Sequence, residues 1–196
     1  MRLLGEINSP DISRAVAAAP ELLGLIDRTN LSYVDRNQFG QALVLGGHYD
    51  EGWAALSSAA EEIDKGNHGY AQWLWWQAAW AAWWDRDRAK LRRATRAALT
   101  DAAGAPMPRE AWDYAQWLTA WFLDDVSEAE FVEYCNADRM KADDAQFFIG
   151  EKLLRAGKRA EAKAAYERSV ELGAQSGDIW AANFARWRLA QLEKAE

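Results

Sequence analysis

The sequence has few of the side chains that build covalent cross-links or metal sites: one cysteine, Cys135, and two histidines among 196 residues. A single cysteine excludes a disulfide within the chain and is typical of a reducing compartment, so we expect a cytoplasmic protein. A metal site needs several ligands at helical or loop spacing, and the chain has no His-x-x-x-His or Cys-x-x-Cys motif. We therefore expect neither a metal nor a cofactor.

Long apolar runs and prolines are also scarce. The longest apolar run lies within residues 70–84 and is interrupted by Gln72 and Gln77, which leaves it shorter than the roughly 20 residues that a bilayer-spanning helix needs. The opening Met-Arg-Leu-Leu-Gly-Glu has no long apolar core behind its arginine, so we expect no signal peptide. With four prolines and half of its residues apolar, the composition indicates a globular protein, and no membrane partner is expected.

Positive charge is in deficit, with 23 Lys and Arg against 30 Asp and Glu and a formal net charge of −7. This balance repels phosphates, so we expect no nucleic-acid partner. The exception is the helix expected at residues 85–99, whose cations are Arg86, Arg88, Lys90, Arg92, Arg93 and Arg96. They could bind phosphates, but the overall acidity favours a solvated face, partly neutralised by the acidic stretch at 124–133.

Sequence motifs of common catalytic sites are absent as well. The chain has no glycine-rich phosphate loop and no Gly-x-Ser-x-Gly motif. A nucleophile at Cys135 would have to meet one of only two histidines. The many carboxylates lie on expected helix surfaces, where they serve solvation. We therefore expect that the chain is not an enzyme.

Helix-forming residues, by contrast, are abundant. Alanine, leucine, glutamate and arginine dominate and β-branched residues are few, so the sequence predicts an all-α fold. In residues 143–174, Phe147, Gly150, Leu153 and Leu154 recur at helical spacing, and Tyr166 continues the pattern after Gly157. Gly157 can end one helix and permit a tight turn. Gly150 lies inside a helical pattern, which indicates that a neighbouring helix packs closely there.

This pattern recurs along the chain. Gly40 and Gly47 correspond to Gly150 and Gly157 at one constant offset, and Gly47 is followed by His-Tyr-Asp-Glu. The pentapeptide Tyr-Ala-Gln-Trp-Leu that begins at Tyr70 begins again at Tyr114. Paired helices with one glycine at the contact, one at the turn and a Gly-x-Tyr-Asp-Glu segment resemble the tetratricopeptide repeat family, whose repeats are about 34 residues long.

The resemblance implies a right-handed α-α superhelix of about four helical hairpins, forming one domain over residues 1–196. The implied hairpins are residues 33–64, 68–100, 109–136 and 143–174, between an N-terminal helical cap at 9–31 and a C-terminal capping helix at 178–194. Local signals add boundaries. Ser9 is expected to start one cap helix and Pro20 a second. Ser32 offers a cap for the first repeat, and Ser127 with Glu130 predicts a capping box.

Tryptophan is unusually frequent, with twelve in the chain and six of them between Tyr70 and Trp84. A helix that is apolar nearly all round is buried, so we assign the stripe of Trp73, Trp76, Trp80 and Trp83 to the core. Trp75 and Trp112 lie off the main stripes, on helices expected at 70–84 and 109–123. We expect these two side chains to face solvent.

The resemblance implies a concave groove that binds a peptide or a partner protein, and the expected occupant is an apolar, aromatic segment. The implied groove residues are Asn37, Gln41, Trp75, Trp112, Thr119, Phe147 and Glu151. Two alternatives stay open. Exposed aromatic residues could form a homodimer in a self-assembling structural protein, or the tryptophan-rich interior could form the pocket of a ligand-sensing module.

Overall fold

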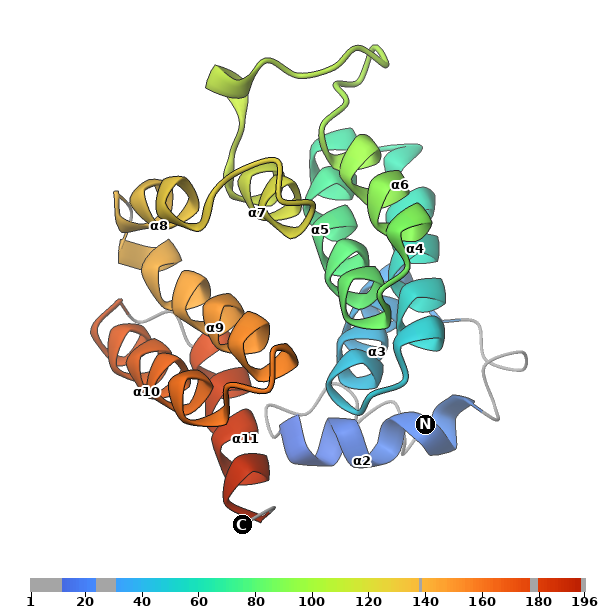
Figure 1. Ribbon diagram of the computed structural model, residues 1–196. Coiled ribbons are helices and arrows are strands. Elements are labelled where there is room, and N and C mark those ends of the chain that lie inside the picture. Colours follow the sequence, from blue (N-terminus) through green and yellow to red (C-terminus); the bar gives the residue numbers. More distant parts are fainter. Residues whose placement is uncertain (1–11, 24–30, 138, 177–179, 195–196) are drawn as a thin grey trace. The chain divides into compact units, whose positions relative to one another are not determined.

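The computed structural model describes residues 12–23, 31–137, 139–176 and 180–194 (Figure 1). Within these residues the only pairing of β type is an isolated bridge between Thr100 and Pro106, and the regular structure is otherwise helical. The predicted all-α class is confirmed. The chain divides into two compact units. The first ends at Val126, and the second begins at Ser127.

The first unit is built from six α-helices and one short 3-10 helix among its described residues. They are α2 (Ile12–Leu23), α3 (Tyr33–Leu45), α4 (Tyr49–Asp64), α5 (His68–Asp85), α6 (Arg88–Ala98), η2 (Arg109–Ala111) and α7 (Tyr114–Phe122). Each of α3 to α6 packs on the helix that follows it, and α5 also packs on α7 (Figure 1). As predicted for the tryptophan helix, α5 is buried nearly all round, with Trp76 and Trp80 among the most buried side chains.

The second unit contains α8 (Glu128–Asn136), α9 (Arg139–Arg155), α10 (Arg159–Ser176) and α11 (Trp180–Lys194). Helix α9 packs on α8, α10 and α11. The core of the second unit contains Phe147 and Phe148 from α9, Tyr166 from α10 and Phe184 from α11.

Helix starts follow the capping signals in the sequence. Ser32 accepts a hydrogen bond from the Asp35 amide, and the Asp35 carboxylate accepts one from the Ser32 amide in return. Ser127 and Glu130 form the same reciprocal pair at the start of α8. Both caps satisfy amide groups that the first turn of a helix leaves without partners. The predicted start at Ser9 lies outside the described residues.

The glycines that mark the two clearest helical pairs take the geometry expected of them. A Cβ placed on Gly40 would lie 2.5 Å from Leu56 Cγ on α4, and one on Gly150 would lie 2.5 Å from Tyr166 Cε1 on α10. Gly47 and Gly157 have φ values of 86° and 78°, in the left-handed region that favours glycine. Close helix contact and a left-handed turn are therefore confirmed in both pairs.

Two predicted helix boundaries are wrong. Pro20 does not start a second helix but lies inside α2. Pro20 is exposed. The buried Ala15, Ala18 and Ala19 of α2 anchor the helix in the core, which offsets the loss of the hydrogen bond that proline cannot donate.

The second error concerns residues 109–123, which were expected to form one helix. The short 3-10 turn η2 ends at Ala111, and Trp112 is extended with φ −72° and ψ 134°. Helix α7 begins only after Asp113, which forms a capping box with Gln116. The cap at Asp113 determines this start, so Trp112 lies outside any helix.

Candidate functional site

The two groove residues predicted on α3 lie in a buried chain of amides. Gln41 Nε2 donates to Asn37 Oδ1 at 3.4 Å and also to Gln77 Oε1 on α5. All three side chains are buried. Asn37 and Gln41 are thus brought together, but as a polar contact inside the packing of α3 and α5.

The exposures of Trp75 and Trp73 are the reverse of those predicted. Trp75 is only 6% exposed and lies 6.3 Å from the Trp53 ring of α4, with the Arg93 guanidinium of α6 at 6.0 Å. Trp73 is 38% exposed. Because α4 and α6 enclose α5 on two sides, the surface left open passes through Tyr70 and Trp73, three residues apart. The predicted exposure of Trp75 and the predicted burial of Trp73 are both wrong.

Trp112 and Thr119 lie in different environments. Trp112 is half-buried, and its Nε1 donates to the Met107 carbonyl at 3.2 Å. The Arg109 guanidinium lies 5.9 Å from the Trp112 ring and 4.7 Å from the Trp117 ring. Thr119 is fully buried, and its hydroxyl donates to the Ala115 carbonyl one turn earlier at 3.0 Å. Of these two residues, only Trp112 is partly exposed to solvent.

The two groove residues predicted in the second unit are core residues. Phe147 is fully buried among Tyr166, Trp180 and Phe184. Glu151 is fully buried, where it accepts hydrogen bonds from Arg188 Nε at 2.7 Å, Arg188 Nη2 at 2.9 Å and the Tyr166 hydroxyl at 2.7 Å. Burial, and then the negative charge of Glu151, raise the pKa of Tyr166 far above its ordinary value. The Glu151 carboxylate is therefore used within the fold.

A continuous aromatic surface, which helical periodicity did not predict, lies on α3 and α5. We call it the aromatic patch: Tyr33, Tyr70 and Trp73. The Tyr33 and Tyr70 rings meet edge to face at 6.0 Å, and the Tyr70 and Trp73 rings stack at 5.6 Å with an interplanar angle of 15°. Tyr70 and Trp73 are 37% and 38% exposed, and they are two of the three exposed large hydrophobic side chains of the described residues. The third, Val34, lies next to Tyr33 in α3.

The patch rests on a buried aromatic base. Trp76, one turn along α5 from Trp73, meets the Trp73 ring edge to face at 5.9 Å and the Tyr114 ring of α7 at 6.2 Å. Trp76 and Tyr114 are buried. The caps Ser32 and Asn67 place Tyr33 and Tyr70 in the first turns of α3 and α5, but they carry no signal for the contact between the two rings.

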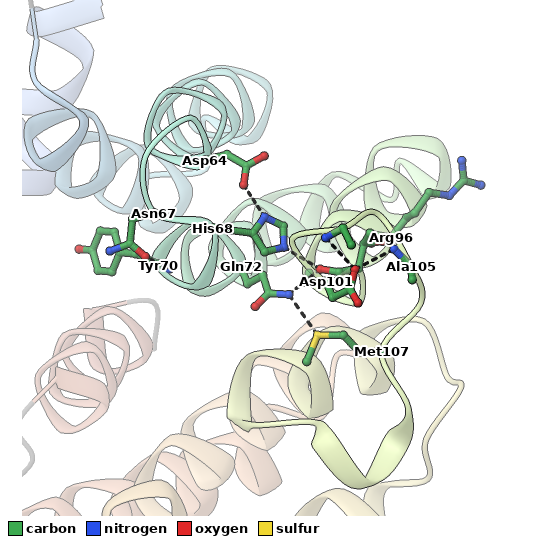
Figure 2. Close-up of polar contacts among 12 residues, drawn as sticks. Asp64, Asn67, His68, Tyr70, Gln72, Arg96, Asp101, Ala105 and Met107 are labelled. Atoms are coloured by element: carbon green, nitrogen blue, oxygen red, sulfur yellow. Dashed lines mark hydrogen bonds and ion pairs between the residues drawn. The ribbon is translucent and has the colours of Figure 1, made fainter.

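A polar cluster surrounds His68 at the start of the same helix. Its Nδ1 lies 2.5 Å from Asp64 Oδ1 and its Nε2 lies 2.8 Å from the Thr100 carbonyl oxygen. Figure 2 shows the imidazole joined to the Asp64 carboxylate. The hydrogen bond to Thr100 and then the Asp64 carboxylate raise the pKa of His68, because both partners favour the protonated ring. Both ring nitrogens are engaged, so His68 has no nitrogen left for a general base or a metal ligand.

The cluster also anchors the loop that joins α6 to η2. Gln72 Nε2 donates to the Thr100 carbonyl at 2.6 Å. It also contacts Met107 Sδ at 3.1 Å, as Figure 2 shows. Within the loop, Asp101 Oδ1 accepts from the amides of Ala103 and Ala105 at 2.9 and 2.8 Å. The loop is thus held by side chains from the first turns of α5, the same helix that carries Tyr70 and Trp73.

Comparison of the chain with protein-family models, curated proteins and solved structures finds no match. Among the described residues, no group of three or more His, Cys, Asp and Glu side chains is placed to hold a metal ion. A search of the same residues finds no helix with the length and apolar character that crossing a membrane demands.

Proposed function

We propose that this chain is a non-enzymatic binding module that captures a short peptide segment of a partner protein on the aromatic patch. The observation that carries the proposal is the exposure of Tyr70 and Trp73 on a rigid buried base. Aromatic side chains of this kind supply large contact area with little loss of conformational entropy. Residues that can anchor a partner's apolar side chain are usually few and clustered in this way.

A short segment fits the patch better than a second copy of the chain. Val34, Tyr70 and Trp73 are each between 37% and 44% exposed, and they are the large hydrophobic side chains that the described residues leave open. A stable dimer buries roughly 800 Å² on each partner, more than the open parts of a few side chains provide. We therefore propose a peptide with one or two aromatic or branched aliphatic anchors.

The proposed architecture is a tetratricopeptide-like array. Support comes from the glycine contacts at Gly40 and Gly150 and from the left-handed turns at Gly47 and Gly157. In such an array the first helix of each pair lines the binding groove, and Tyr33 and Tyr70 lie on α3 and α5, which would be first helices. The proposed groove is thus lined at the patch rather than at the buried Trp75.

A peptide-display selection tests this function. A random library of about twelve residues is selected on the parent protein, and the affinity of the enriched peptides is measured by fluorescence anisotropy. We expect an aromatic or branched aliphatic consensus and at least a tenfold loss of affinity in Trp73→Ala, as for an interface anchor. Trp187→Ala, a partly buried tryptophan on α11, is the control and should bind as the parent does.

Stability measurements on the same variants separate binding from folding. Trp73→Ala should stay folded and lose less stability than Trp75→Ala, which should lose about 3–5 kcal/mol, as large core truncations do. No enriched peptide, or enriched peptides that bind Trp73→Ala unchanged, would refute the proposal. A parent that sediments as a dimer and a Trp73→Ala variant that sediments as a monomer would support self-assembly instead.

A further inference from the structure

The exposed surface of α6 carries a line of arginines. Arg88, Arg92 and Arg96 are all exposed and follow one another at intervals of four residues. On a helix this spacing places them along one flank, about 6 Å apart and about 12 Å from end to end. The opposite face of α6 holds Leu91, Ala94 and Ala98 in the core. We call the three arginines the arginine stripe.

The other cations of α6 are already neutralised. Lys90 pairs with Asp50 of α4 and lies 3.5 Å from Asp85 and 3.7 Å from Asp87. Arg93 pairs with Glu61, also on α4. The flank of α6 that faces α4 is therefore balanced in charge.

The arginine stripe has no such partner in the described part of the first unit. No carboxylate there lies within ion-pair distance of Arg88, Arg92 or Arg96. Figure 2 shows the Arg96 side chain extending away from the His68 cluster. Three adjacent guanidinium groups of like charge repel one another, and on a chain with a net charge of −7 they are a local reversal of sign.

We propose that the arginine stripe is a docking surface for an acidic peptide segment. Guanidinium groups bind carboxylates through two parallel hydrogen bonds, which gives both strength and orientation. Carboxylates on alternate residues of an extended segment are about 6.6–6.8 Å apart, close to the spacing of the stripe. A segment of about five residues with three acidic side chains would match the stripe from end to end. This site is separate from the aromatic patch and does not depend on the function proposed for it.

An acidic peptide fits these surroundings better than a nucleic acid. Binding of single strands combines cations with aromatic faces that are free to stack on bases. Here Trp83 is buried, and Trp84 is stacked on Tyr49 at 5.7 Å with an interplanar angle of 6°. Asp50 and Glu61 on α4 already pair with Lys90 and Arg93, so α6 offers a longer polyanion no further unpaired cations beyond the stripe.

Fluorescence anisotropy with three labelled probes tests the proposal. The probes are a nine-residue peptide that alternates glutamate and glycine, its glutamine counterpart, and a single-stranded oligothymidine of about twelve nucleotides. We expect the parent to bind the glutamate peptide at least tenfold more tightly than either other probe. Affinity for the glutamate peptide should also fall as salt rises from about 50 to 200 mM, since exposed charge pairs are screened.

Two triple variants with the same change in charge decide the location. R88Q/R92Q/R96Q should lose at least tenfold in affinity for the glutamate peptide. The control K65Q/R186Q/K194Q removes three exposed cations elsewhere and should lose less than threefold. Circular dichroism melts establish that both variants are folded, and Trp73→Ala should bind the glutamate peptide as the parent does. Equal losses in the two triples, no preference for glutamate over glutamine, or tighter binding of the oligothymidine would each overturn the proposal.

Discussion

Gly150 shows how closely two helices can approach at a single residue. A Cβ at this position would lie 2.5 Å from Tyr166 Cε1 and 2.6 Å from Cδ1. The Tyr166 ring has little freedom to move aside, because its hydroxyl donates to the buried Glu151 carboxylate at 2.7 Å. From its helical position alone, Gly150→Ala would be a mild change, since alanine favours helix. The contact with Tyr166 reverses that expectation.

We predict that Gly150→Ala lowers the free energy of unfolding by about 1–3 kcal/mol, the usual cost of overpacking a core. Gly66→Ala is the matched control, because no atom lies within 4 Å of a Cβ built there. The control should stay within about 0.5 kcal/mol of the parent, as surface substitutions usually do. Urea unfolding measures both, and equal stabilities of the two variants would contradict the close contact of α9 with α10.

At the scale of elements, one carboxylate joins three helices of the second unit. Glu151 on α9 accepts from Tyr166 on α10 and twice from Arg188 on α11. An ion pair of this kind adds little net stability over an apolar pair, but loss of one partner leaves a buried charge unpaired. The contact therefore specifies how the three helices meet.

A double-mutant cycle tests this role. We predict that Arg188→Met alone destabilises by about 3–5 kcal/mol, since it strands the Glu151 charge. The double variant Glu151→Gln/Arg188→Met should be more stable than Arg188→Met, because no charge is left to bury. Urea unfolding followed by circular dichroism gives the coupling energy. Additive effects of the two substitutions would show that Glu151 and Arg188 do not interact.

His68 links two further elements to α5. Asp64 lies at the end of α4, and Thr100 begins the loop after α6. Asp101 in that loop also acts on His68. Like Asp64, it is negatively charged, so it favours the imidazolium and raises the pKa of His68. Burial of the ring opposes both, yet the pKa of His68 is raised.

This shift makes the attachment of the loop depend on pH. A folded pKa above that of an unfolded histidine, about 6.5, means that the folded protein holds the proton more tightly. The stabilisation is fully present below about pH 6.5 and is lost as the pH rises through the folded pKa. We predict that the difference in unfolding free energy between the parent and His68→Gln, on the order of 1 kcal/mol or less, shrinks from about pH 6 to pH 9.

Denaturant unfolding across that pH range gives the measurement. His48→Gln serves as the comparison, since His48 lies in the turn before α4 and away from this loop's contacts. A difference between parent and His68→Gln that grows with pH would mean that the ring is not held between two acceptors.

At the scale of the whole molecule, the chain consists of two units that each bury their own aromatic core. The first is centred on Trp76, Trp80 and Trp121, and the second on Phe147, Phe148 and Tyr166. Each unit therefore has the apolar interior that independent folding requires.

We predict that residues 1–126 and 127–196, expressed as separate chains, are each helical and melt cooperatively. The second fragment should be the less stable, because small domains bury a smaller fraction of their surface. Far-UV circular dichroism and thermal melts provide the readout. A fragment that is unfolded on its own would show that its core is completed only in the full chain.

The sequence by itself determined the features that depend on neighbours along the chain. Composition indicated the all-α class, Ser32 and Ser127 marked helix starts, and Gly47 and Gly157 marked left-handed turns. Each is a local effect of backbone conformation or of a side chain that reaches an amide three residues away. The burial of α5 was also predictable, since a helix apolar on all sides must be covered.

Only the tertiary structure decided which side chains stay open. Trp73 and Trp75 are both tryptophans on the same helix, α5. Their different exposure depends on which sides of α5 are covered by α4 and α6. Likewise, Lys90 and Arg93 each pair with a carboxylate of α4, whereas the arginine stripe has no carboxylate within ion-pair distance among the described residues of the first unit. Periodicity divides a helix into faces, but the positions of its neighbours decide which face meets the core, a counter-charge or water.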